Sequence, residues 1–389
     1  MRDVPFISLF TGAGGLDLGL ERATLPGVDD GPRLTTALAC EYDPWAVATL
    51  LAAQKDGFFR DEFDVERDVR DLHGPALSRA MKKAGLKKKE LFLVAGGPPC
   101  PAFSTAGKRL SLADMRGQLM YDYLTVVQEA RPRFFLLENV RGLLSASLKH
   151  RPLAERGRGA APLEADEQPG TAMQAILNAV SDIGYQAVYG RVNAANYGSP
   201  QLRHRTLIFG SRNKEFDKDA TLLDLMPKTH LEHPEREDYL PWKTLESALK
   251  GLDDPEPEYQ KYSAERARWF DLIPPGGNWR HLRDAYSPEL AAEALGGAWE
   301  SSGGKVGFFR RLAWGRPAPT LVTSPIQKAT GFCHPEALRP LTVREYARVQ
   351  EFPDGYPFQG GVSKKYMQVG NAVPLSLAEA AGRALLKFA

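Results

Sequence analysis

The chain has little cysteine: only Cys40, Cys100 and Cys333 occur in 389 residues. An odd number without paired spacing predicts neither a disulfide framework nor a zinc cluster, and it favours a reducing compartment. The sequence also lacks any apolar run long enough to span a bilayer, which argues against a membrane-embedded class. We therefore expect a cytoplasmic protein whose thiols are available for chemistry.

Net charge is also nearly absent, at +2 near neutral pH. A global positive field is thereby excluded, so any nucleic-acid binding must depend on local basic clusters. The apolar fraction of 43% and the charged fraction of 25% are those of a globular protein, and the length suffices for two domains.

Strand-like apolar runs alternate with helical stretches through the first half of the chain. This alternation is typical of a parallel sheet covered by helices on both faces, an α/β fold. From Phe216 to about Pro319 the alternation is lost, and Pro, Trp, Gly and acidic residues predict an irregular second domain. An amphipathic pattern returns at 375–388, where we expect a helix packed on the first domain.

Glycines and acids follow the first strand-like runs. Gly12 and Gly14 predict a turn whose backbone can approach a ligand closely, but Asp17 replaces the third glycine of the dinucleotide fingerprint. Glu41 and Asp68 end later runs, where a carboxylate can accept hydrogen bonds from a ribose and from an adenine amino group. For both acids the alternative is a helix cap or a solvated charge.

A lone cysteine stands in a stiff loop, Gly97–Pro101, after the run 91–95. Its prolines fix the backbone and remove hydrogen-bond donors, so the thiol of Cys100 is displayed as a nucleophile would be. The alternative is a small buried apolar residue, the usual fate of free cysteine.

One acid and two arginines complete the candidate site. Glu138 follows the buried-looking run 134–137, where it is suited to donate a proton to a ring nitrogen. Arg203 and Arg205 precede the run 206–210, and strand alternation predicts that they point to the same side. The alternative for the arginines is an ordinary solvated pair.

In this order, these segments resemble the DNA (cytosine-5)-methyltransferase family. The matching segments are Phe10–Gly15, Glu41, Gly97–Ser104, Glu138–Val140, Gln201–Arg205, Arg339–Pro353 and Gln368–Pro374. One departure is Pro101, where many members carry glutamine; we expect altered loop stiffness and retained activity. The resemblance implies a Rossmann-like methyltransferase sheet in residues 1–215, completed by 365–389, and a smaller, irregular target-recognition domain in 216–364.

The resemblance also assigns catalytic roles. Cys100 would add to C6 of a cytosine flipped out of double-stranded DNA, and Glu138 would bind N3 and the amino group. Arg205 would hold O2, and Arg203 would position Glu138. The methyl group would pass from S-adenosylmethionine to C5, leaving S-adenosylhomocysteine, with no metal.

Cofactor and DNA contacts follow from the same resemblance. Phe10 would stack on the adenine, Glu41 would hold the ribose and Asp68 the adenine amino group. The expected cofactor residues are Phe10, Gly12, Gly14, Leu16, Glu41, Asp68, Asn371 and Val373. The expected DNA residues, in a loop closing over the duplex, are Ser104, Lys108, Arg109 and Arg116. In the second domain Arg310, Arg311 and Arg316 are suited to base edges and phosphates. A lysine cluster at 82–89 receives no role.

The favoured interpretation is a monomeric DNA modification enzyme of a restriction-modification system, acting at the nucleoid beside a cognate endonuclease. A transfer-RNA cytosine-5 methyltransferase of the same family is the first alternative. A catalytically silent nucleic-acid-binding relative is the second, against which the intact Cys100, Glu138, Arg203 and Arg205 argue. A nicotinamide oxidoreductase is disfavoured by the missing third glycine.

Overall fold

The computed structural model describes residues 2–88, 90–99, 115–149, 151, 155, 161–300, 307–327 and 330–389. Two compact units form the chain. The sheet unit comprises Met1–Asn193, His204–Lys228 and Ala378–Ala389, and the second unit comprises Ala194–Arg203 and Thr229–Leu377. The domain boundaries expected at 215/216 and 364/365, and target recognition by residues 216–364, stay predictions. No helix of the described part is long and apolar enough to cross a membrane.

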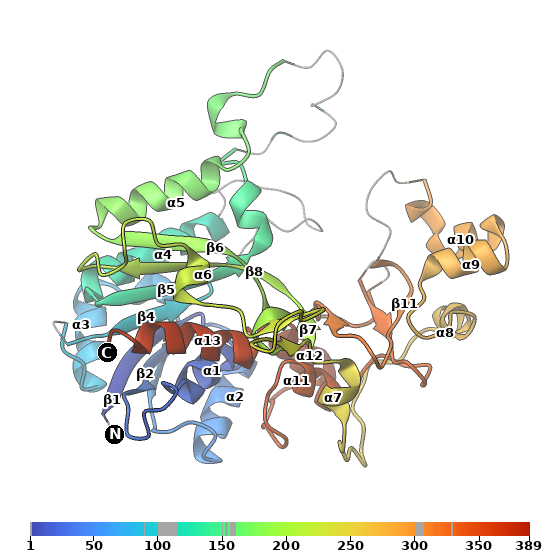
Figure 1. Ribbon diagram of the computed structural model, residues 1–389, viewed down its shortest axis with the longest axis horizontal. Coiled ribbons are helices and arrows are strands. Elements are labelled where there is room, and N and C mark those ends of the chain that lie inside the picture. The colour runs from blue at the N-terminus through green and yellow to red at the C-terminus, as the bar shows by residue number, and fades with distance from the viewer. Residues whose placement is uncertain are drawn as a thin grey trace. The chain divides into compact units, whose positions relative to one another are not determined.

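A seven-stranded sheet forms the centre of the sheet unit, with the order β3-β2-β1-β4-β5-β8-β6 (Figure 1). Its strands are β1 Asp3–Leu9, β2 Arg33–Cys40, β3 Asp64–Glu66, β4 Leu93–Gly96, β5 Phe134–Val140, β6 Gln186–Asn193 and β8 His204–Ser211. Strands β1 to β5 are parallel. Since the strand order reverses between β1 and β4, the loops that follow these two strands border the crevice where open α/β sheets bind ligands. The Rossmann-like fold expected from the sequence is confirmed.

One strand departs from the expected parallel arrangement. Strand β8 pairs antiparallel with both β5 and β6. The reason is the short connection Ala194–Arg203, which holds no crossover helix that would return the chain for a parallel pairing.

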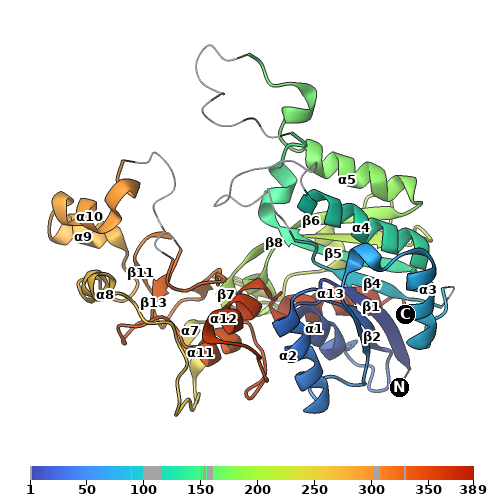
Figure 2. The same cartoon turned by 180° about the vertical axis from the view of Figure 1, so that it is seen from behind.

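Helices cover both faces of this sheet. They are α1 Gly15–Arg22, α2 Pro44–Lys55, α3 Gly74–Lys83, α4 Met115–Ala130, α5 Thr171–Asp182, α6 Leu222–Leu225 and α13 Leu375–Leu386, with short 3-10 turns at Val69–Asp71, Arg141–Ser145 and Ala165–Glu167. Helices α3, α4 and α5 lie on one side of the sheet (Figure 2). Their apolar side chains share one core with strand residues such as Phe135. The neighbouring Phe134 points to the other face, where its ring centroid lies 5.3 Å from that of Phe388.

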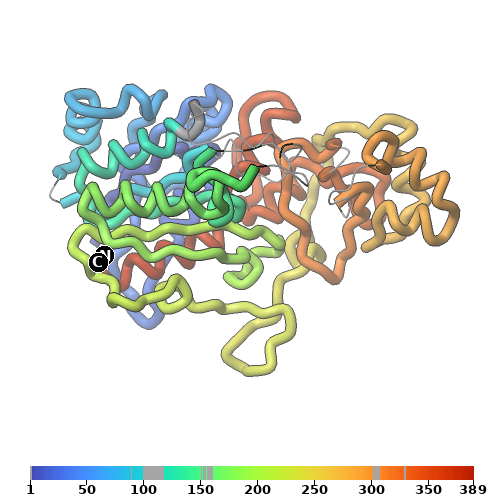
Figure 3. The backbone as a smooth tube through the Cα atoms, turned by 90° about the horizontal axis from the view of Figure 1, so that it is seen from above, coloured from blue at the N-terminus to red at the C-terminus, as the bar shows by residue number. Residues whose placement is uncertain are grey.

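The C-terminal helix packs on the sheet unit, as its amphipathic pattern predicts. A Cβ atom at Gly382 of α13 would lie 2.8 Å from the Cβ of Ala23, so glycine permits the close approach to the end of α1. Arg383 donates to the carbonyl of Thr24. The C-terminal helix α13, drawn in red, thus runs beside the blue N-terminal part of the sheet unit (Figure 3).

The second unit consists of short elements. Its helices are α7 Leu245–Leu249, α8 Ala264–Asp271, α9 Trp279–Ala285, α10 Pro288–Leu295, α11 Val343–Val349 and α12 Val362–Asn371, with 3-10 turns at Ala194–Tyr197 and Gly296–Ala298. Its strands, β7 Gln201–Leu202, β9 His230–Leu231, β10 Leu240–Pro241, β11 Arg310–Arg311, β12 Ala318–Pro319 and β13 Phe332–Cys333, pair two by two. Capping side chains begin several helices: Ser263 for α8, Asn278 for α9 and Ser287 for α10. Trp269 and Phe270 anchor the core that these three helices share.

Candidate active site

A buried ion pair lies at the carboxyl edge of the sheet. Arg205 Nε is 2.6 Å from Glu138 Oε1, and the two side chains are 10% and 13% exposed. The antiparallel register places Arg205 opposite Val140, diagonal to Glu138 on the same face. Arg205 also donates to the carbonyl of His204 at 2.9 Å. Low exposure and this second hydrogen bond fix the guanidinium, so the pair is a preorganised charged group.

The loop after β4 approaches this ion pair closely. A Cβ atom at Gly97 would lie 3.0 Å from Glu138 Oε2, so any larger residue would crowd the carboxylate. Asn139, which is 2% exposed, donates from Nδ2 to the carbonyl of Pro98 at 3.1 Å. Residues 97–99 are therefore held against the end of β5. Sequence reasoning gave Asn139 no role, although it stands next to Glu138 in a matching segment.

The predicted nucleophile and most of the predicted DNA residues fall outside the described part of the chain. These are Cys100, Ser104, Lys108 and Arg109, together with the side chain of Arg116. The described loop leads directly to Cys100, and their assignments stay predictions.

The glycine-rich turn after β1 has an unusual backbone. Phe10, Gly12 and Gly14 all have positive φ, at 56°, 60° and 82°. For the non-glycine Phe10 this is a strained conformation of the kind found at functional sites. Gly14 caps α1 without a side-chain hydrogen bond, so N–H groups of the first helical turn are available to a ligand.

Glu41 fixes this turn from the end of β2. Its Oε2 accepts from Gly12 N and its Oε1 from Asp43 N, both at 2.7 Å. Burial raises the pKa of Glu41, although these backbone hydrogen bonds oppose the shift. Each oxygen retains a further lone pair, so the carboxylate can still accept from a sugar hydroxyl.

Asp68 caps the 3-10 turn Val69–Asp71, which is the alternative to a ligand-binding role that the sequence left open. It accepts from Arg70 N at 2.9 Å and from the Arg70 guanidinium, whose hydrogen bonds hold its pKa below the usual range. An adenine amino group would have to share this carboxylate with Arg70. Leu16, the other expected cofactor residue here, is buried in the first turn of α1.

The structure corrects the position given to Arg203. It is 2% exposed in the second unit, and it donates to Leu321 O at 3.1 Å and Gly370 O at 2.9 Å. Glu138 forms its ion pair with Arg205, and the role expected of Arg203 in positioning Glu138 stays a prediction. Strand β8 begins only at His204, so strand alternation does not extend back to Arg203.

A second buried polar side chain, missed by sequence reasoning, holds the same segment of the second unit. Gln350 donates to Val369 O at 2.7 Å and Ala372 O at 3.0 Å. Together with Arg203 it fixes the end of α12. Asn371 is exposed there, and Val373 is buried.

Two exposed arginines that the sequence did not single out lie near the ion pair. Burial lowers the pKa of His204, and the charges of Arg191, Arg141 and Arg205 lower it further. Arg141 and Arg191 are exposed, so they are available to DNA phosphates.

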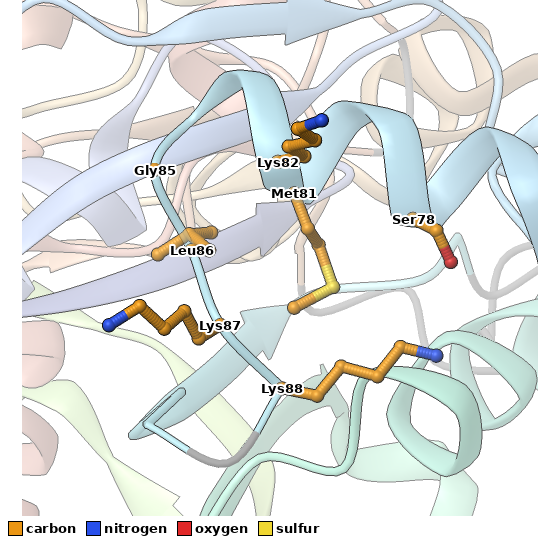
Figure 4. Close-up of a pocket in the computed structure, with 7 residues that line it drawn as sticks. All are labelled: Ser78, Met81, Lys82, Gly85, Leu86, Lys87 and Lys88. Carbon is orange, nitrogen blue, oxygen red and sulfur yellow. The ribbon is translucent and has the colours of Figure 1, made fainter.

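The lysine cluster lies at the opposite edge of the sheet. A hollow of about 320 Å³ there is lined by Ser78, Met81, Lys82, Gly85, Leu86, Lys87 and Lys88. The ammonium groups of its three lysines point in different directions (Figure 4). The loop precedes β4, whereas the ion pair follows the carboxyl ends of the strands. Among the described residues no group of three or more His, Cys, Asp or Glu is arranged to hold a metal.

Comparison with known proteins places this site in a family. Residues 4–387 match the model of the C-5 cytosine-specific DNA methylases. The chain belongs to this family. This methylase is 37% identical to the Type II methyltransferase M.Eco47II of Escherichia coli, over 98% of this chain and 78% of that protein. It is 35% identical to the Type II methyltransferase M.PspPI of Psychrobacter, over 100% of this chain and 80% of that protein.

Solved structures agree on the fold. The methylase matches the Schizosaccharomyces pombe Dnmt2 methyltransferase with a TM-score of 0.60, at 16% identity, over 99% of this chain and 98% of that one. At this identity the likeness concerns the fold alone. With the family match, it makes the chain a cytosine-C5 DNA methyltransferase built on the expected sheet.

Proposed function

We propose that this methyltransferase transfers the methyl group of S-adenosylmethionine to C5 of a cytosine flipped out of a short duplex DNA sequence, as the modification enzyme of a restriction-modification system. One observation carries the proposal: the buried Glu138–Arg205 pair lies against the loop that leads to Cys100. The Type II methyltransferases among its relatives support the biological setting.

The residues divide the reaction between them. The thiolate of Cys100 forms a bond to C6 and shifts an electron pair to C5, while Glu138 binds N3 and the amino group and Arg205 holds O2. C5 then takes the methyl group. Loss of the C5 proton to a base returns the electrons to the ring, and the C6–sulfur bond breaks to release the thiolate.

The turn after β1 suits the methyl donor. S-adenosylmethionine supplies an activated methyl group on a sulfonium. Phe10, Gly12, Gly14 and Leu16 would enclose the donor, and Glu41 would accept from its ribose. Support comes from the uncapped start of α1 and the lone pairs left on Glu41. Asp68, Asn371 and Val373 complete the proposed set.

DNA would be bound by basic side chains around this edge. Arg141 and Arg191 are proposed phosphate contacts, together with Ser104, Lys108, Arg109 and Arg116 from the predicted loop. Protein contacts must replace the few kcal/mol that unstacking a base costs. The proposal includes action as a monomer at the nucleoid, beside a cognate endonuclease.

The first test supplies labelled S-adenosylmethionine together with unmethylated genomic DNA or bulk transfer RNA, followed by bisulfite sequencing. We expect label in DNA, at cytosines of one short sequence. Label only in RNA would move the assignment to a transfer-RNA methyltransferase, and no label in either would leave a nucleic-acid-binding relative.

A second test examines the covalent step. In DNA carrying 5-fluorocytosine at the methylated position, the C5 fluorine cannot leave as a cation, so the adduct accumulates. The wild type should give a complex that survives denaturing electrophoresis, only when S-adenosylmethionine is present. The Cys100→Ser variant should give none while still binding the methyl donor, and a stable complex with this variant would refute the role of Cys100.

A further inference from the structure

A buried arginine of the second unit fixes a loop at residues 323–327. Arg266, in the first turn of α8, is 8% exposed. Its guanidinium donates from Nη1 to the carbonyl of Ile326 at 2.6 Å and from Nη2 to that of Gln327 at 2.7 Å. No carboxylate of the described part of the chain pairs with this charge. The two carbonyls of the loop are therefore the main polar partners of Arg266.

Three aromatic rings lie around the same guanidinium. Its Cζ is 5.3 Å from the ring centroid of Tyr262, 5.5 Å from that of Phe270 and 5.6 Å from that of Phe309. Such cation–π contacts return part of the lost hydration energy, but burial still lowers the pKa of Arg266. A buried charge without an opposite charge costs stability, so its benefit lies in the loop that it holds.

The backbone of Gln327 is held from a second side. Gly331 N donates to the carbonyl of Gln327 at 2.8 Å, and a Cβ atom at Gly331 would overlap this carbonyl and that of Pro325. With Arg266 and Gly331 as donors, both lone pairs of the Gln327 carbonyl are engaged. The side chain of Gln327 is nevertheless exposed. An exposed residue on so fixed a backbone is preorganised for a partner outside the chain.

The exposed amide of Gln327 is oriented as well. Thr330 Oγ1 donates to Gln327 Oε1 at 2.9 Å, so the acceptor end of the amide is engaged. Its Nε2, with two N–H groups, has no partner among the residues that the structure describes. Two neighbouring donors match two neighbouring acceptors. In the major groove of DNA only guanine presents such a pair, N7 and O6, whereas adenine presents one acceptor and one donor.

We propose that Gln327 recognises a guanine of the target sequence through Nε2, and that Arg266 is the positioning residue that holds Gln327 in place. This inference rests on the proposed function, since it requires duplex DNA as the substrate. The two residues have separate tasks. Gln327 is exposed and contacts the base, whereas Arg266 is buried and acts only through the loop. Removing either residue should therefore affect the same base pair of the target.

Bisulfite sequencing of unmethylated genomic DNA treated with the full chain tests the inference. The wild type defines the target sequence. Gln327→Ala should reduce the preference for guanine at one position of that sequence by about 5- to 100-fold and leave the other positions unchanged. Gln327→Glu presents acceptors in place of the two donors, so the preference at this position should turn to cytosine, whose N4 donates. A merely structural residue would not reverse a base preference.

The same measurement tests Arg266. Arg266→Lys keeps the charge but lacks the planar fork that spans the two carbonyls. It should relax the choice at the guanine position, and it should add nothing when combined with Gln327→Ala. The matched control is Arg268→Gln on the same helix, because the guanidinium of Arg268 is exposed and pairs with Glu293. This variant should keep the wild-type sequence.

Several outcomes would overturn the inference. These are an unchanged sequence choice in both Gln327 variants, a general loss of methylation in a folded Gln327→Ala protein, and an effect of Arg266→Lys that adds to that of Gln327→Ala. Should Arg266→Lys fail to fold, Thr330→Val serves instead. It removes the hydroxyl that orients the amide and should weaken the choice at the same position, so an unchanged choice would refute the inference. If the wild type methylated no DNA, the proposed function itself would be refuted.

Discussion

Four arginines, one in the sheet unit and three in the second unit, differ in their main partners. In the sheet unit, Arg205 pairs with the carboxylate of Glu138. In the second unit, Arg203, Arg266 and Arg311 donate to backbone carbonyls of loops and of a helix end that are distant in the sequence. Loops lack the ladder partners that satisfy carbonyl groups in a sheet, and a guanidinium with its five N–H groups can supply several at once. An arginine in the second unit is therefore a candidate for DNA contact only where it has no such partner.

The largest effect should come from the charge pair of the sheet unit. Glu138→Gln keeps the shape of the side chain but removes the negative charge that pairs with Arg205 and that would bind the amino group of the base. We expect turnover to fall by about 10²- to 10⁴-fold, measured by methyl transfer at saturating donor and DNA.

The control for this variant is the binding of S-adenosylmethionine, which should change little because Glu138 does not belong to the glycine-rich turn. Turnover within a few-fold of the wild type would contradict the catalytic role of the Glu138–Arg205 pair, because the pair would then be only structural.

Arg203 should show the opposite pattern, a loss of stability. Arg203→Met leaves the buried carbonyls of Leu321 and Gly370 without their donors, which should lower the free energy of unfolding by about 2 to 4 kcal/mol. Urea unfolding measures the change. Arg203→Lys can donate to only some of these carbonyls, so its free energy of unfolding should lie between those of the wild type and of Arg203→Met. If Arg203→Met had normal stability and reduced turnover, the result would instead support a catalytic role for Arg203.

Arg310 tests whether an arginine without a partner in the second unit contacts bases. Its backbone pairs with β13, but within the described ranges its side chain has no hydrogen bond or ion pair, and burial lowers the pKa of its guanidinium. Its neighbour Arg311 donates to the carbonyls of Phe270, Ile273, Pro335 and Glu336.

Arginine recognises guanine through two hydrogen bonds. We therefore expect Arg310→Gln to lower the free-energy preference for one base pair of the target sequence by about 1 to 3 kcal/mol. Bisulfite sequencing of methylated genomic DNA would reveal the relaxed position. The matched Arg311→Gln variant should lose stability and keep its sequence choice. Unchanged specificity in Arg310→Gln would remove this residue from target recognition.

Much of the sheet unit could be predicted from the sequence because its apolar runs and motifs are local. Glu138 and Arg205 each adjoin an apolar strand, so their meeting at one edge follows from pairing of those strands. The reversal of β8 could not be predicted, because it depends on a connection too short for a crossover.

Buried polar contacts were the least predictable part of the site. Arg203 lies one residue before a strand begins, and this small offset sends its side chain to different partners. Asn139 and Gln350 act on carbonyls that are remote in the sequence, which no local pattern encodes. For Asp68 the sequence left two roles open, a contact to the cofactor or a helix cap.

The smallest effect should come from the lysine hollow. Lys87 and Lys88 lie before β4, at the sheet edge opposite the Glu138–Arg205 pair. Lys87→Glu combined with Lys88→Glu should therefore leave DNA affinity within about twofold and its salt dependence unchanged. The matched double variant Arg141→Glu and Arg191→Glu, near the ion pair, should weaken binding and reduce the slope of log affinity against log salt by about 2. If the lysine variant lost affinity and the arginine variant did not, the DNA would have to contact the amino edge of the sheet, and the proposed approach of the duplex to Glu138 would be wrong.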